Sequence, residues 1–180
     1  MTGLALESAA IASAVERAVD GDEIAFARIV GAYHLDLVRV AYVICGDEGL
    51  AEDAAQAAWW IAWRKLPALR DPDRLKPWLV AVAANEARKV VRREHRHGVV
   101  ELRVAADPPT DADPSVAIDQ VDLANALGRL KPEDRALVAM RYAADLDSFA
   151  LAPILGLSPS GVRSRLSRLL DRLRKEFGDD

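Results

Sequence analysis

Arginine is the residue type whose placement is most informative here, because it gathers on one segment near the C-terminus. Six basic side chains between Val162 and Phe177 stand against Asp171 and Glu176, a local excess of four positive charges. Guanidinium groups bind phosphate oxygens and guanine edges through paired N–H donors. The segment therefore predicts a DNA-binding surface.

The residues before this segment predict that it is the second helix of a helix-turn-helix. Ser148 is suited to cap a short helix that ends at Leu155, and Gly156 is suited to the left-handed turn that follows. Ser158 and Pro159 then open the second helix. Two short helices joined by a tight glycine turn are typical of this DNA-binding motif.

The second helix is amphipathic, with one side for packing and one side for DNA. At the helical period, the apolar residues share one arc: Val162, Leu166, Leu169, Leu170, Leu173 and Phe177. We expect the remaining side, together with the start of the helix, to contact DNA through Ser158, Ser160, Arg163, Ser164, Arg165 and Arg168. The alternative is a solvated amphipathic helix.

A second basic segment runs from Asn85 to His97. Its basic residues are Arg88, Lys89, Arg92, Arg93 and Arg96, against Glu86 and Glu94, an excess of three positive charges. Because Arg88, Arg92 and Arg96 are four residues apart, they share a helix face that could follow one phosphate backbone. The alternative is that these cations only complement the C-terminal end of a helix.

The segment from Leu50 to Leu66 predicts a different kind of surface. Its apolar arc is made of five alanines and Leu66, and the opposite side carries Trp60 among polar residues. Because aromatic anchors ringed by polar groups favour protein interfaces, we expect Trp60 to bind a partner protein. The alternative is that a neighbouring helix or loop covers this ring.

Helical periodicity and the lack of strand-like alternation predict an all-α fold of two small domains. Breaks are expected at Asp20–Asp22, at Gly46–Gly49 and between Pro67 and Pro77. The domains are expected at residues 10–97 and 117–177. Residues 98–116, rich in proline and aspartate, are expected to form an acidic linker.

Composition limits the classes of function. The chain has 180 residues and a net charge of −4, so we expect a partner to supply part of its DNA affinity. Cys45 is the single cysteine, which excludes an intramolecular disulfide. The sequence has no apolar run of bilayer length and no signal-peptide pattern at its start, so we expect a cytoplasmic location without membrane insertion.

Taken in order, these three signals resemble the extracytoplasmic-function (ECF) sigma factors of bacterial RNA polymerase, the class that retains only sigma domains 2 and 4. The resemblance covers about residues 12–177. It rests on the helix-turn-helix and on two further sets of residues: Glu52, Asp53, Gln56, Trp59 and Trp63, then Trp78, Asn85, Arg92 and Arg93.

The resemblance implies a dissociable specificity subunit of core RNA polymerase, with neither catalytic residues nor a metal or other cofactor. The expected polymerase contacts are the β′ clamp helices and the β flap, and an anti-sigma partner is a further expectation. Together with the exposed Trp60, the residues expected to bind polymerase are Glu52, Asp53, Gln56 and Trp60. Those expected at the −10 element are Arg74, Lys76, Trp78, Asn85, Arg88, Arg92 and Arg93, and the helix-turn-helix is expected at the −35 element.

Two other classes of function are compatible with parts of the sequence. A stand-alone helix-turn-helix transcription regulator accounts for the C-terminal segment but not for the basic segment that ends at His97. A metal-dependent enzyme would use Glu94, His95 and His97 with His34. Because residues 95 and 97 diverge on a helix, they would converge only if the helix had already ended.

Overall fold

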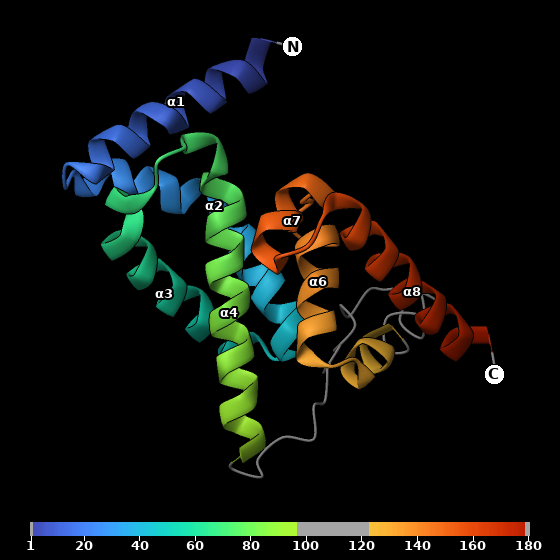
Figure 1. Ribbon diagram of the computed structural model, residues 1–180. Coiled ribbons are helices and arrows are strands. Elements are labelled where there is room, and N and C mark those ends of the chain that lie inside the picture. Colours follow the sequence, from blue (N-terminus) through green and yellow to red (C-terminus); the bar gives the residue numbers. More distant parts are fainter. Residues whose placement is uncertain (1, 97–122, 179–180) are drawn as a thin grey trace.

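The computed structural model describes residues 2–96 and 123–178, and every regular element within these ranges is a helix (Figure 1). The all-α prediction is confirmed. The first unit contains α1 (Thr2–Val19), α2 (Glu23–Cys45), α3 (Glu48–Lys65) and α4 (Leu75–Arg96), with single 3-10 turns at Leu66–Ala68 and Pro72–Arg74. The second contains a helical segment over 123–129, then α6 (Pro132–Tyr142), α7 (Ser148–Leu155) and α8 (Pro159–Gly178).

Aspartates and glycines set the ends of the first helices. Asp22 accepts a hydrogen bond from the Ala25 amide at 2.9 Å and so begins α2 after the break expected at Asp20–Asp22. Gly46 ends α2 with φ of +72°. The second break is shorter than expected, because Asp47 caps α3 at once and Gly49 already lies inside that helix.

The core of the first unit is built on an alanine stripe. The buried side of α3 carries Ala51, Ala54, Ala55, Ala58 and Ala62, all at most 1% exposed. Small side chains let α2 and α4 approach α3 closely, and the larger residues of those helices fill the space between them. These larger residues are Leu37, Val40, Ile44, Leu79 and Val80.

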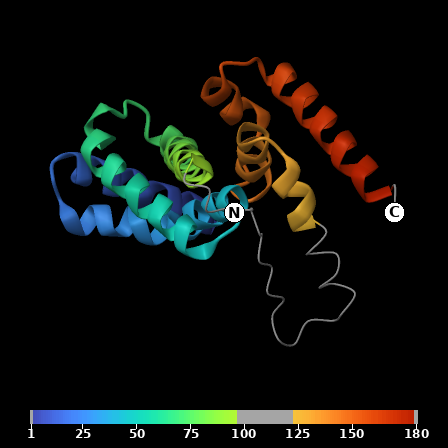
Figure 2. The ribbon, with the colours of Figure 1, turned by 90° about the horizontal axis from the view of Figure 1, so that it is seen from below.

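The second unit packs directly against the first. Helix α6 contacts α2 and α4, and α7 contacts α4, so that the buried residues of both units form one continuous apolar cluster. Viewed from below, α8 lies on the side of α6 and α7 that faces away from the first four helices (Figure 2). The expected linker, residues 98–116, lies outside the described residues.

Candidate nucleic-acid and polymerase interfaces

The C-terminal unit contains the predicted helix-turn-helix. Helix α7 ends at Leu155, and Gly156 adopts φ of +65° in the turn. Ser158 caps α8 by accepting a hydrogen bond from the Gly161 amide at 3.1 Å. The prediction that Ser148 caps α7 is wrong. Asp147 holds that position and accepts from the Ala150 amide at 2.8 Å, so Ser148 becomes the first residue of the helix.

Helix α8 buries the predicted apolar side. Val162, Leu166, Leu169 and Leu173 are buried and Leu170 is half-buried, while the side chain of Phe177 lies outside the described residues. Of the six residues predicted to contact DNA, Arg165 is half-buried and the other five are exposed: Ser158, Ser160, Arg163, Ser164 and Arg168. Helix α8 therefore packs its apolar side against the protein and leaves its polar and basic side open to solvent.

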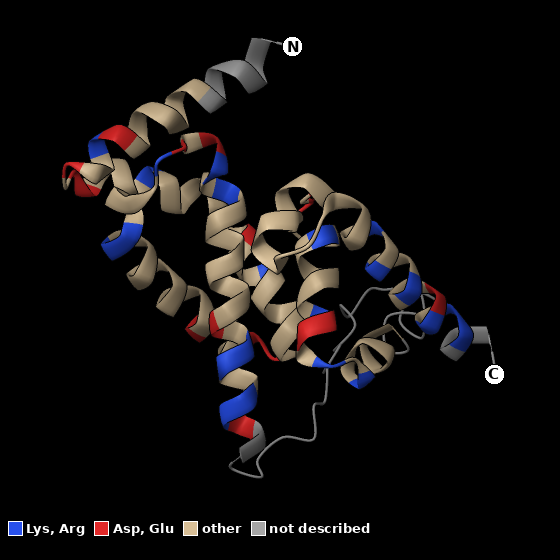
Figure 3. Ribbon diagram, in the orientation of Figure 1, with Lys and Arg blue, Asp and Glu red and all other residues tan. Residues whose placement is uncertain are grey.

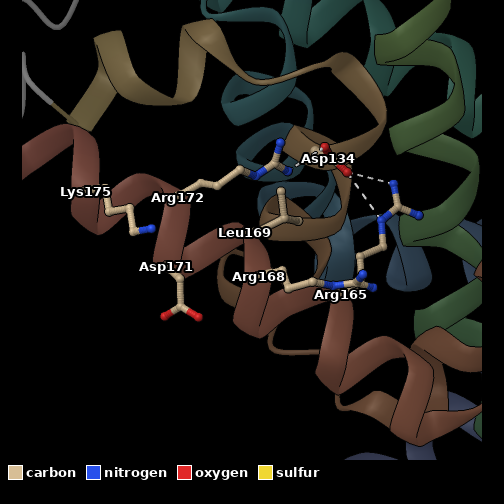
Figure 4. Close-up of a pocket in the computed structure, with 7 residues that line it drawn as sticks. All are labelled: Asp134, Arg165, Arg168, Leu169, Asp171, Arg172 and Lys175. Atoms are coloured by element: carbon tan, nitrogen blue, oxygen red, sulfur yellow. Dashed lines mark hydrogen bonds and ion pairs between the residues drawn. The ribbon is translucent and has the colours of Figure 1, made fainter.

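Two arginines of α8 bind a carboxylate of α6. Arg165 donates to Asp134 Oδ1 from Nη2 at 2.7 Å and from Nε at 3.3 Å, and Arg172 donates to Oδ2 at 3.2 Å. In Figure 4 the two guanidinium groups reach Asp134 from opposite sides, while Asp171 points away from it. These residues line a groove of about 470 Å³ together with Arg168, Leu169 and Lys175.

The basic half of α4 forms a second surface, visible as a run of Lys and Arg at the lower end of that helix (Figure 3). Asn85, Arg88 and Arg92 line one groove of about 270 Å³ with side chains of α3. Both arginines donate to Glu133 Oε1 of α6, Arg92 at 2.6 Å and Arg88 at 3.3 Å. Arg93 instead pairs with its neighbour Glu94 on the same helix.

The end of α3, the connecting loop and the start of α4 form a separate hollow of about 400 Å³. Its lining consists of Lys65, Ala68, Leu69, Arg70, Asp71, Arg74 and Trp78. Asp71 orients this loop by accepting from the Asp73 amide and by pairing with Arg74. Lys76, predicted to belong to the same surface, is half-buried and pairs with Asp36 of α2 at 2.9 Å. Five of the predicted −10 residues thus line two neighbouring hollows, and Lys76 and Arg93 lie outside both.

The outer face of α3 carries the predicted protein-binding residues. Trp60 is 64% exposed, so no neighbouring element of residues 2–96 and 123–178 covers it, and Asp53 and Gln56 are exposed beside it. Arg64 lies over the Trp60 ring, 5.9 Å from its centre. Glu52 is half-buried and lies 3.5 Å from His34 Nε2.

Aromatic side chains support this face from below. Phe26 of α2 meets the rings of Trp59 and Trp63 edge to face, at 5.8 Å and 4.8 Å between ring centres. Trp59 is buried and donates from Nε1 to His34 Nδ1 at 3.2 Å. A hollow of about 350 Å³ opens between Glu23, Gln56 and these four rings, Trp60 included. The face is therefore apolar at its centre, where the rings pack on one another, with polar groups around it.

Three consecutive residues of α6 carry contacts that sequence reasoning missed. Glu133 and Asp134 hold the arginines described above, and Arg135 is only 2% exposed. Arg135 donates to the carbonyl oxygen of Ile44 in α2 at 2.8 Å and to those of Gly128 and Leu130. Two acids in the first turn of a helix are expected from the helix dipole alone, so the sequence held no specific signal.

Within the described residues, no three His, Cys, Asp or Glu side chains are placed to hold a metal ion. The side chains of His95 and His97, on which the metal-site alternative depends, lie outside the described residues. The same part of the chain contains no helix with the length and apolar character needed to cross a bilayer.

Comparison with known proteins decides between the sigma factor and the stand-alone regulator. Residues 29–97 match the family model Sigma-70 region 2, and residues 120–173 match Sigma-70, region 4. The two matches together cover more than half of the chain, in the order of the two structural units. The chain belongs to the ECF sigma factors. Region 2 spans the helices with the Trp60 face and the α4 arginines, and region 4 contains the helix-turn-helix.

Curated relatives of this ECF sigma factor include other sigma factors. The probable RNA polymerase sigma factor RfaY of Xanthomonas campestris pv. campestris is 32% identical over 169 residues, covering 89% of this chain but only 42% of RfaY. The RNA polymerase sigma factor CarQ of Myxococcus xanthus is 28% identical, covering 92% of this chain and 96% of CarQ. ECF sigma factor SigW of Bacillus subtilis is 24% identical, covering 92% and 95%.

Two solved structures share the arrangement of this sigma factor. The sigma factor RpoE of Bartonella quintana, bound to the anti-sigma factor NepR, has a TM-score of 0.70 and 25% identity, covering 86% of this chain and 98% of RpoE. CnrH bound to the cytosolic domain of CnrY has a TM-score of 0.72 and 22% identity, covering 95% and 99%. The likeness to CnrH shows the fold alone.

Proposed function

We propose that this ECF sigma factor docks on core RNA polymerase through the α3 face and places α4 and α8 on one promoter. The observation that carries the proposal is the pair of arginine-rich helices, one in each matched sigma region, with the exposed Trp60 face on a third helix. We assign residues 10–97 to sigma domain 2, 98–116 to the linker and 117–177 to sigma domain 4.

In this proposal α8 enters the major groove of the −35 element. The start of the helix carries small exposed residues, Ser160 and Ser164, which allow close approach to base edges. Arg168 lies one turn after Ser164 on the same exposed side, within reach of a guanine edge or a phosphate. Arg163 and Arg165 flank this line and are suited to phosphate contacts.

The −10 element is assigned to α4 and the loop before it. Asn85, Arg88 and Arg92 line one hollow and Arg74 and Trp78 the other, which places cations and an aromatic ring along one path. Single-stranded DNA is held by such a combination, cations following the backbone and a ring stacking on an unpaired base. Arg93 and Lys76 would add to these backbone contacts once phosphate replaces their present partners, Glu94 and Asp36.

Polymerase docking is assigned to Glu52, Asp53, Gln56 and Trp60, with the β′ clamp helices as their partner and the β flap as the partner of the C-terminal unit. All chemistry is left to the polymerase, so the sigma factor itself is not an enzyme and needs no cofactor. We infer that it works in the cytoplasm, with its polymerase and promoter. Because RpoE is seen with an anti-sigma factor, we propose such an inhibitor here too.

Run-off transcription tests this function. Core RNA polymerase is incubated with a library of promoter fragments, with and without the purified sigma factor. Transcripts that begin only in its presence are expected, and their start sites give the promoter motif. If core polymerase neither binds nor initiates, while the protein alone shifts duplex DNA, a stand-alone helix-turn-helix regulator becomes the better account.

A further inference from the structure

Glu133 and Asp134 of α6 each bind two arginines, and the two pairs come from different helices. Glu133 holds Arg88 and Arg92 of α4 across the boundary between the two units. Asp134 holds Arg165 and Arg172 of α8 within the second unit. Two adjacent carboxylates therefore contact four arginines, two on each of the helices assigned to the promoter.

These contacts use the same guanidinium N–H donors that an arginine offers to a phosphate. Arg165 directs two N–H groups at one oxygen of Asp134, and Arg172 takes the other oxygen. A guanidinium binds carboxylate and phosphate with the same planar set of donors, so one anion can replace the other.

The helix dipole does not account for this arrangement. The attraction between the positive N-terminal end of the helix dipole and a carboxylate would explain why two acids lie in the first turn of α6. It does not require that four arginines of other helices converge on them. Both carboxyl groups are held ionised. The hydrogen bond from Arg92 lowers the pKa of Glu133. At Asp134 burial raises the pKa, but the hydrogen bonds and charges of Arg165 and Arg172 together outweigh burial and lower it.

We propose that Glu133 and Asp134 are an internal competitor of promoter DNA, occupying arginines of α4 and α8 in the unbound sigma factor until phosphate displaces them. This inference rests on the proposed function, since it takes these helices to be the promoter-binding ones.

The neighbouring residue Arg135 holds the competitor in place. Its guanidinium is buried between α6 and α2 and donates to the Ile44 carbonyl oxygen at 2.8 Å. Because a buried cation needs such acceptors, the contact favours one position of α6 against the first unit. Glu133 is thereby kept within reach of the α4 arginines.

The test is DNA binding by the full-length protein without polymerase. Fluorescence anisotropy with a labelled promoter duplex, over a range of salt concentrations, compares the wild type with the double variant Glu133→Gln/Asp134→Asn. The matched control is Glu16→Gln/Asp145→Asn, which changes the net charge equally by removing two exposed acids that pair with no arginine of α4 or α8: Glu16 of α1 and Asp145, the partner of Arg141.

The competitor variant is expected to bind about tenfold more tightly than the control variant, with a steeper dependence on salt because more phosphates are contacted. Equal affinity and equal salt dependence in the two double variants would overturn the proposal. Glu133→Gln alone, at a 42% exposed side chain, provides a second comparison if the double variant folds poorly, and should give a smaller gain of the same sign.

This comparison is independent of transcription. If the wild type initiates with core polymerase but the two double variants bind DNA equally, the internal competition is overturned and the proposed function stands. If the wild type fails to initiate but the Glu133→Gln/Asp134→Asn variant binds DNA more tightly than the control, the proposed function is overturned and the internal competition stands.

Discussion

At the scale of single residues, the helix-turn-helix depends on which side chain caps α7. Asp147 and Ser148 are adjacent, and both types are strong N-cap residues. Only the backbone decides between them: Asp147 is extended, with φ of −76° and ψ of 174°, and Ser148 is already helical. The sequence therefore predicted a capped helix correctly but named the wrong cap.

We predict that Asp147→Ala lowers the free energy of unfolding by about 1 kcal/mol, because the Ala150 amide loses its acceptor. Ser148→Ala removes only a half-buried hydroxyl that accepts from Arg163 at 3.2 Å and makes no cap, and should change stability by less than about 0.5 kcal/mol. Urea unfolding of both variants measures the difference. A larger loss for Ser148→Ala would contradict the cap assignment.

At the scale of elements, amphipathic patterns predicted well which sides of α3 and α8 are buried. The alanine stripe of α3 and the leucines of α8 lie inside, as the helical period required. The partner of Arg165 was beyond prediction, because Asp134 lies 31 residues earlier in the sequence and on another helix. Helical periodicity predicts which side of a helix is buried but not which residues of other helices contact it.

For α8, we predict that Arg168→Ala weakens binding to duplex DNA carrying the −35 element by about 1–3 kcal/mol, because a base or phosphate contact is lost. The control Arg174→Ala removes the same charge from the same helix, where Arg174 pairs with Asp171. It should cost clearly less. Electrophoretic mobility shifts with polymerase present provide the measurement, and equal losses would show that Arg168 acts only through charge.

For α3, we predict that Trp60→Ala lowers affinity for core RNA polymerase by about 2 kcal/mol or more, as aromatic anchors at interfaces do. Stability should be unchanged, because the ring is largely exposed. Leu35→Ala on α2 removes an apolar side chain of similar exposure, 65%, and is the control. Unchanged affinity of the Trp60 variant in a pull-down would exclude this face from the polymerase contact.

At the scale of the whole molecule, the two units form one body through contacts that are distant in sequence. Glu133 meets Arg92 across 41 positions, and Arg135 meets Ile44 across 91. No local pattern encodes such pairs. The sequence predicted two helical units in the right order, but not the packing of one against the other.

This packing should depend on pH. The carboxyl groups of Glu133 and Asp134 have lowered pKa values in the folded protein, below the unfolded values of about 4.3 and 3.9. Each therefore contributes stability that is fully present above its unfolded pKa and is lost as pH falls through its folded pKa.

We accordingly predict that urea stability of the wild type falls more steeply below about pH 4.5 than that of Glu133→Gln/Asp134→Asn, since the variant has no such protons to take up. The charged groups that face these acids are Arg88, Arg92, Arg165 and Arg172. Parallel pH profiles would show that the ion pairs contribute nothing to folding.

The central claim is that α4 and α8 contact two elements of one promoter while the sigma factor is bound to polymerase. The most direct measurement is initiation from a responsive promoter after the spacer between its elements is lengthened by about five base pairs, half a helical turn. Initiation should be lost, because α8 would then face the wrong side of the duplex. Undiminished initiation from the lengthened promoter would contradict the claim.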